Sequence, residues 1–179
     1  MTLWLLWTLQ AFAGTLADVT LPDTATVGGQ ALVLNGLGLR EKMYFDIYVG
    51  GLYLPAKTTD SAKAVSEDVA KRIVMQFIYS GGVPKDKMNE TFDESFGKQG
   101  AAGVAQESNK NTLKGWMDDM APGDQVVLDY VPGTGTTVTV KGTRKGTIPG
   151  ADFMRVLWSV YVGPNPPTAA LKNGMMSGK

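Results

Sequence analysis

The residues best suited to chemistry lie in one short stretch, NGLGLREKMYFDIYVGGLYL, at positions 35–54. It carries Arg40, the first Lys or Arg of the chain, and then Tyr44, Asp46 and Tyr48. If the chain stays extended from residue 40, these four side chains share one face of a strand, because strand side chains alternate. A guanidinium beside hydroxyl donors is suited to hold an anion or to stabilise developing negative charge.

The other face of that strand would be apolar, and we expect it to pack against helices. It would carry Met43, Phe45, Ile47 and Val49. The polar face then has two interpretations. It either meets water, with Asp46 paired to a lysine, or it forms the cationic end of a pocket. Periodicity alone favours the solvated face.

Composition narrows the chemistry further. The 179 residues include no histidine and no cysteine. This excludes Ser-His-Asp and Cys-His nucleophile systems, ordinary zinc sites and disulfides. We therefore expect no metal and no cofactor, and acid–base chemistry would fall to carboxylates, lysine, tyrosine or groups polarised by arginine. A formal net charge of zero, without a basic cluster, argues against a nucleic-acid partner.

The first 17 residues, MTLWLLWTLQAFAGTLA, form an apolar run too short to span a bilayer. Small residues stand at Ala11, Ala13 and Ala17, as signal peptidases prefer, although no basic segment precedes the run. We expect a signal peptide over residues 1–17 that ends after Ala13 or Ala17, followed by one domain over 18–179. The alternative is a buried N-terminal strand or helix. We expect a periplasmic or secreted protein with no membrane span in the mature chain, and the absence of cysteine favours a Gram-negative periplasm.

The remaining pattern predicts an α+β fold, an antiparallel sheet with a layer of helices on one face. Alternation and turn residues predict strands within 18–38 and at 43–54, 71–80, 124–131 and 136–142. Helical spacing predicts a short helix within 61–70, a helix from 84 through 96, a second up to about 120 and a buried helix over 151–163. We also expect a short C-terminal helix before a flexible tail, NGMMSGK.

Three segments in this order resemble the chalcone isomerase family. GLGLR and the aromatic strand ending GGLYLP are similar to the opening of its fold. SGGVPKDKMNETFDESF stands where the family has a strand-to-helix active-site segment, and IPGADFMRVLWSVYVGPNPPTAALKNGMM is similar to its last helix and tail. The resemblance spans roughly residues 25–175 and is greatest to the bacterial, exported chalcone-isomerase-like proteins. It implies the chalcone isomerase fold, an open-faced sandwich.

The resemblance also implies site residues. The family's catalytic arginine matches Arg40, its strand threonine falls on or near Tyr48, and the polar position of its last helix falls near Ser159.

The active-site helix departs from the plant enzymes, whose pattern is Tyr-x-x-Lys-x-x-x-Asn. Here the same spacing reads Pro84, Lys87 and Thr91, so the lysine is kept but the tyrosine and asparagine are not. Pro84 offers no donor and Thr91 a short one, which argues against the plant reaction.

Three functions follow from the resemblance. The first is binding of a small apolar or carboxylate ligand, fatty-acid-like, in a cleft between sheet and helices, without catalysis. Its candidate ligand-binding residues are Arg40, Tyr44, Tyr48, Lys87 and Thr91. The second is an isomerase, an intramolecular lyase acting on a chalcone-like enone, with Arg40, Tyr48 and Lys87 as catalytic residues. The third is an interaction module that assists another exported protein; oligomeric state is not predicted.

Overall fold

The computed structural model describes residues 13–179. Residues 1–12 of the expected signal peptide lie outside the described residues. The described strands are β1 (Ala13–Leu16), β2 (Val19–Pro22), β3 (Thr24–Val27), β4 (Gln30–Lys42), β5 (Phe45–Leu54), β6 (Lys71–Phe77), β7 (Gln125–Val131), β8 (Gly135–Val140) and β9 (Thr143–Ile148). The described helices are α1 (Ser61–Ser66), α2 (Lys85–Gly97), α3 (Gly100–Ala105), α4 (Glu107–Trp116), α5 (Ala151–Val162) and α6 (Ala169–Met175).

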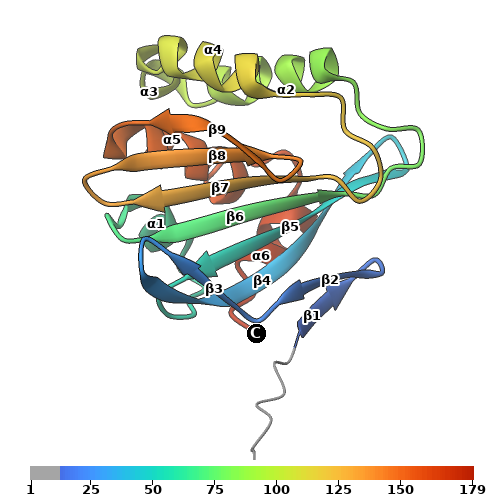
Figure 1. The fold of residues 1–179 in the computed structure, drawn as a ribbon, viewed down its shortest axis with the longest axis horizontal. Coiled ribbons are helices and arrows are strands. Elements are labelled where there is room, and N and C mark those ends of the chain that lie inside the picture. Colours follow the sequence, from blue (N-terminus) through green and yellow to red (C-terminus); the bar gives the residue numbers. More distant parts are fainter. Residues whose placement is uncertain (1–12) are drawn as a thin grey trace, which may run out of the picture.

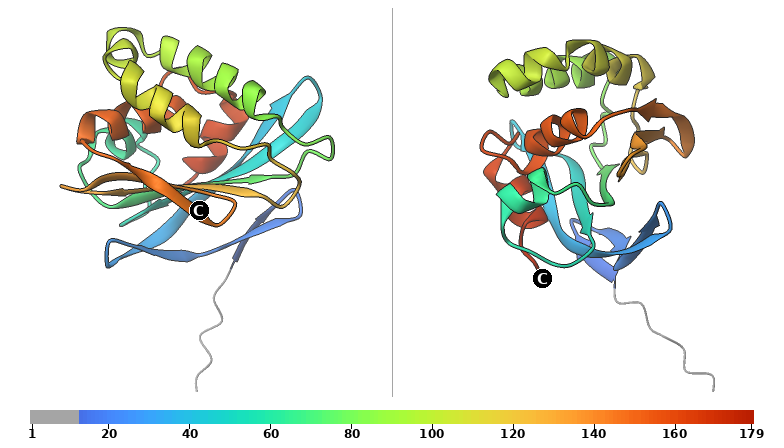
Figure 2. Two further views of the ribbon diagram at one scale, coloured as in Figure 1. Left: turned by 45° about the horizontal axis from the view of Figure 1, so that its top comes forward. Right: turned by 90° about the vertical axis from the view of Figure 1, so that its left-hand side faces the viewer.

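One antiparallel sheet organises the molecule. Its seven strands pair in chain order from β3 to β9, so every strand lies beside its sequence neighbours (Figure 1). The sheet curls around the helices, while the separate β1–β2 hairpin lies on the opposite side of the sheet (Figure 2). The predicted α+β sandwich with helices on one face is therefore confirmed.

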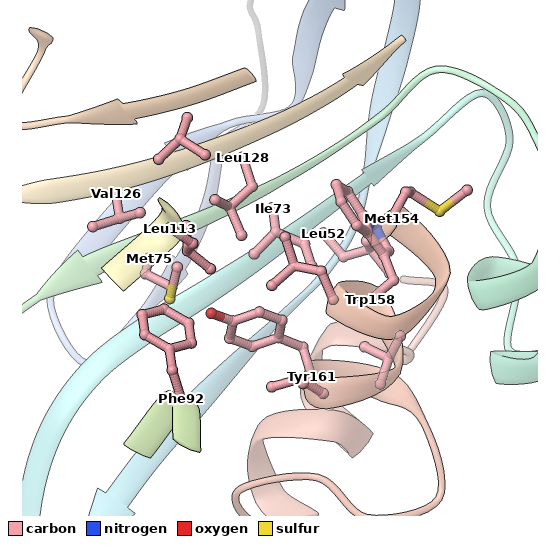
Figure 3. Close-up of a cluster of buried hydrophobic side chains, with 14 of the residues drawn as sticks. Leu52, Ile73, Met75, Phe92, Leu113, Val126, Leu128, Met154, Trp158 and Tyr161 are labelled. Atoms are coloured by element: carbon pink, nitrogen blue, oxygen red, sulfur yellow. The ribbon is translucent and has the colours of Figure 1, made fainter. Parts of the chain in front are cut away.

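Two apolar cores lie on the two faces of the sheet. The larger core joins the sheet to the helices and contains Leu52, Ile73, Leu128 and Trp158 (Figure 3). The smaller core lies under the β1–β2 hairpin and includes Leu21, Val49 and Tyr53. Since strand side chains alternate, Tyr48 and Leu52 face the helices while Val49 and Tyr53 face the hairpin.

The helical periodicity predicted from the sequence is confirmed in α2 and α5. Met88, Phe92 and Phe96 form the buried stripe of α2. Helix α5 buries side chains around most of its circumference, including Met154 and Trp158. A helix that is apolar on nearly all sides must be covered on nearly all sides, so α5 lies within the sandwich.

The predicted single strand beginning near residue 40 is wrong. Met43 and Tyr44 have φ angles of 50° and 72°, so the chain reverses there and Lys42 pairs with Phe45 across a two-residue loop. The expected assignment of faces is wrong as well. Tyr48, and not Val49, faces the helices, and the Met43 and Phe45 side chains are exposed.

Two helix boundaries and one strand also differ from the prediction. Helix α4 ends at Trp116, because Val83 and Met120 exchange two backbone hydrogen bonds and hold the following residues extended. Strand β9, whose sequence TRKGTI is polar, was not predicted. Helix α6 continues through Asn173, Gly174 and Met175, which the sequence analysis assigned to a flexible tail.

The glycines of NGLGLR explain why that tail is ordered. A methyl group at Gly38 would lie 2.0 Å from the carbonyl oxygen of Leu171, and one at Gly36 would lie 2.2 Å from that of Gly174. The α6 backbone therefore lies directly on β4. Asn35 fixes the contact by donating from Nδ2 to the Met175 carbonyl oxygen at 2.8 Å.

Candidate functional site

A cavity of about 220 Å³ opens between the sheet and helices α2 and α5. Its lining is mostly apolar and comes from β4, β5, β6, the segment from Tyr79 to Pro84, α2, α5 and Pro167. The lining residues are Arg40, Lys42, Ile47, Tyr48, Met75, Phe77, Tyr79, Gly82, Val83, Pro84, Lys87, Met88, Thr91, Phe92, Ser95, Val160, Tyr161 and Pro167.

Arg40 and Tyr48 define one end of the cavity. They are direct partners across β4 and β5, so both side chains lie on the helix side of the sheet. A β-bulge follows, because the next pair is Glu41 with Asp46 and Ile47 is the extra residue. The bulge lets Ile47 line the cavity beside Tyr48.

Arg40 is half-buried as a residue. Within residues 13–179 it forms no salt bridge, and its hydrogen bond is to the neighbouring backbone carbonyl oxygen of Glu41. A guanidinium without a carboxylate partner at an apolar cavity can accept an anionic ligand without first breaking an ion pair.

Two phenols complete the polar part of the site. Burial raises the pKa of Tyr48, and the positive charge of Arg40 offsets this only in part. Burial also raises the pKa of Tyr161, and Tyr48 adds to the effect. Both phenols are therefore protonated donors at neutral pH. The Tyr161 hydroxyl points toward Met75 and Phe92, which also line the cavity (Figure 3).

The expected residues of α2 line the cavity but have other partners. Lys87 Nζ donates to Glu90 at 2.8 Å and is exposed, and this hydrogen bond raises its pKa. The Thr91 hydroxyl donates to the Lys87 carbonyl oxygen at 2.9 Å, inside its own helix. Both groups therefore already have a hydrogen-bond partner within α2.

Two residues from the sequence analysis lie elsewhere. Tyr44 is fully exposed at the tip of the β4–β5 hairpin and does not line the cavity. Ser159 donates from Oγ to Gln99 Oε1 at 2.8 Å, away from the cavity lining.

Sequence reasoning missed Tyr161 and Ser95 as cavity residues. Tyr161 lies in the buried helix predicted over residues 151–163, and a phenol in so apolar a helix is a signal that could have indicated a polar site. Ser95 is a buried hydroxyl residue between Phe92 and Phe96 on the packed face of α2. A hydroxyl group at that position is also a sequence signal of a polar site.

An open-faced sandwich with a cavity between sheet and helices defines the structural class. The chain belongs to the chalcone isomerase-like family, whose sequence profile matches residues 13–177. A similar solved structure is that of an Arabidopsis thaliana fatty-acid binding protein, with a TM-score of 0.68 and 15% sequence identity, covering 92% of this chain and 96% of that one. Among curated proteins, a search found no match.

Two further findings concern membrane spans and metal sites. Within residues 13–179, no helix has the length and apolar character needed to cross a bilayer. In the same part of the chain, no group of three acidic side chains is placed to hold a metal ion.

Proposed function

We propose that the protein binds one small amphipathic acid, a fatty acid or an aromatic acid. The carboxylate meets Arg40 and the apolar part lies between the sheet and α2. One observation carries the proposal: a half-buried arginine without a carboxylate partner in residues 13–179 lines an otherwise apolar cavity.

The polar groups suit a carboxylate. A guanidinium pairs bidentately with a carboxylate, and a hydrogen bond to a charged group contributes about 1.5–3 kcal/mol. Tyr48 and Tyr161 add neutral donors that stay protonated because burial raises their pKa. Both phenols line the cavity, where a protonated hydroxyl group can donate a hydrogen bond to a carboxylate.

The apolar part of the cavity limits the ligand. Its volume of about 220 Å³ lies just below the range of roughly 300–1,000 Å³ for small-molecule sites. Methionines 75 and 88 line it, and their flexible side chains can adjust to an acyl chain. A chain of short to medium length is expected. The fatty-acid binding protein of the same fold supports this ligand class.

Two measurements test the proposal. Native mass spectrometry of the purified protein is expected to show a co-purified acid, or uptake of one equivalent after mixing with acids of increasing chain length. Calorimetric titration then gives the affinity for each length, with a maximum at the length that fills the cavity. A protein that takes up no acid in either measurement refutes the proposal.

An enzymatic function has one supporting observation, because Arg40, Tyr48 and Lys87 all line the same cavity. Arg40 and a protonated phenol could together stabilise an enolate oxygen. Against this, Lys87 is bound to Glu90 and the Thr91 hydroxyl to its own helix. The test is the rate at which chalcone absorbance is lost in the presence of the wild type and of Arg40→Ala. If both rates equal the spontaneous rate, chalcones are excluded as substrates.

We also propose export to a periplasm. The support is the apolar N-terminal run with small residues at Ala11, Ala13 and Ala17. Ala13 begins strand β1, which pairs with β2, so cleavage after Ala13 retains more of that hairpin than cleavage after Ala17. Intact mass and N-terminal sequencing of the protein from a periplasmic fraction distinguish the two positions, and an uncleaved chain contradicts the proposal.

A further inference from the structure

A hairpin loop next to the cavity carries the main exposed apolar patch of the described residues. Met43, Tyr44 and Phe45 expose 77%, 104% and 52% of their surface. Figure 2 shows the β4–β5 hairpin projecting beyond the rest of the sheet. Val104 on α3 is the other large apolar side chain exposed in residues 13–179. The apolar exposure is thus concentrated on one protruding loop.

The sequence of this loop is unfavourable for its backbone. Three other two-residue hairpin loops, Ala17–Asp18, Gly28–Gly29 and Lys141–Gly142, also have positive φ at both positions. Two of these loops contain glycine and the third consists of two small residues, Ala17 and Asp18, and Asn-Gly is the favoured pair for such loops. Met43 and Tyr44 adopt the same conformation with large side chains, which is strained. Local stability therefore does not explain these two residues.

The apolar loop is continuous with the cavity mouth. The Phe45 ring packs against the Tyr79 ring with centroids 5.1 Å apart. Tyr79 itself lines the cavity, together with Arg40 and Lys42. A surface that covered the loop tip would thus lie beside the part of the cavity lined by Tyr79, Arg40 and Lys42.

We propose that the Met43–Tyr44–Phe45 loop inserts into the surface of a phospholipid bilayer and holds the cavity mouth against it. Aromatic side chains are suited to the boundary between acyl chains and headgroups, and the neighbouring exposed Lys42 can extend to the headgroups. A ligand then passes directly between bilayer and cavity; this step rests on the proposed binding function, whereas the docking does not.

The size of the patch favours a bilayer over a second copy of the chain. Two aromatic side chains of about 150–250 Å² each and one methionine supply less than the roughly 800 Å² per partner of a stable interface. The charges near the loop also balance, since Glu41 and Asp46 offset Arg40 and Lys42. Docking should therefore depend on apolar insertion and change little with salt.

Vesicle flotation with the full chain and phosphatidylcholine vesicles containing phosphatidylglycerol tests the docking. The double variant M43N/Y44G removes the apolar tip and installs the favoured Asn-Gly loop, so it should fold at least as well as the wild type. We expect its vesicle partition coefficient to fall at least tenfold, at low and high salt alike. The control V104S removes an exposed apolar side chain elsewhere and should partition like the wild type.

Two results of this experiment overturn the docking. One is equal partition of the wild type and M43N/Y44G. The other is a wild type that does not float but forms a dimer that the double variant abolishes.

Stopped-flow uptake of lauric acid from the same vesicles tests the transfer step. For the wild type the rate should rise with vesicle concentration. M43N/Y44G should take up the acid at least tenfold more slowly, with unchanged affinity at equilibrium, because neither position lines the cavity. Equal rates overturn direct transfer. If no protein binds the acid, the binding function fails, while flotation still decides whether the loop docks.

Discussion

Arg40 on β4 and Tyr48 on β5 are direct cross-strand partners, and both line the cavity beneath α2. The pairing brings a cation and a phenol to one end of an apolar space. Burial raises the pKa of the phenol more than the Arg40 charge lowers it, so the phenol remains a donor. Tyr161 reaches the same space from α5. The proposed site therefore combines one cationic group with two neutral hydrogen-bond donors.

Replacing Arg40 with glutamine should weaken binding of a carboxylate about ten- to a hundredfold. This follows from the loss of one charge-assisted contact of about 1.5–3 kcal/mol. Calorimetric titration of the best-binding acid measures the change. The methyl ester of that acid should bind the wild type and Arg40→Gln equally, because it carries no charge.

The matched control is Arg144→Gln, which removes an exposed arginine on β9 that does not line the cavity. It should bind the acid like the wild type. If Arg40→Gln and Arg144→Gln bind equally well, Arg40 is not the carboxylate anchor.

Filling the cavity should abolish binding without unfolding the protein. Thr91 is half-buried on the cavity side of α2, so Thr91→Trp places a large ring in the cavity while most of the helix is unchanged. We expect loss of detectable acid binding and a melting temperature within a few degrees of the wild type. Thr112→Trp is the control, because Thr112 makes the same hydrogen bond to the residue four positions earlier but lies exposed on α4. Equal binding by both variants would place the ligand elsewhere.

The sequence predicted the fold class because long apolar periodicities reflect burial directly. The spacing of Met88, Phe92 and Phe96 matches the buried face of α2, and the alternation in β7 and β8 matches their pairing. The β4–β5 reversal was not predictable in this way. Met43 and Tyr44 are unusual residues for a two-residue loop, so the local sequence favours a continuous strand.

The site was predicted in part for a related reason. Arg40 was found because it interrupts an apolar run, and family resemblance gave its role. Its neighbour Tyr48 lies directly across the hairpin on the next strand. The register of strand pairing determines this contact, and the alternation of side chains along one strand does not reveal it. Tyr161 comes from a helix more than a hundred residues later, so only the tertiary fold brings it to the cavity.

Gly38→Ala should destabilise the protein by about 1–3 kcal/mol or more. The added methyl group would overlap the Leu171 carbonyl oxygen, so α6 would have to move away from β4. Chemical denaturation measures the loss. Gly115→Ala is the control, since nothing lies within 4 Å of that position inside α4 and alanine favours a helix by about 1 kcal/mol. A neutral Gly38→Ala would mean that α6 does not rest on the strand backbone.

Lys71 should give the stability of the protein a distinctive pH dependence. Its side chain is fully buried, donates to the Ala64 and Val65 carbonyl oxygens at 2.8 and 3.3 Å, and lies 5.6 Å from the Trp158 ring centre. Burial lowers its pKa from 10.5 to about 8, although nearby Glu67 opposes the shift. A neutral amine still has two hydrogens for the two carbonyl oxygens.

The unfolded chain therefore holds the Lys71 proton more strongly than the folded chain does. Between pH 8 and 10.5 the unfolded state binds more protons, so the free energy of unfolding rises with pH, by at most about 1.4 kcal/mol per pH unit. Lys71→Met cannot show this rise. Urea denaturation of both proteins at half-unit steps from pH 7 to 9.5 should give a difference, wild type minus variant, that grows with pH. Parallel profiles would mean that Lys71 is buried with its ordinary proton affinity, held charged by the carbonyl oxygens and the Trp158 ring.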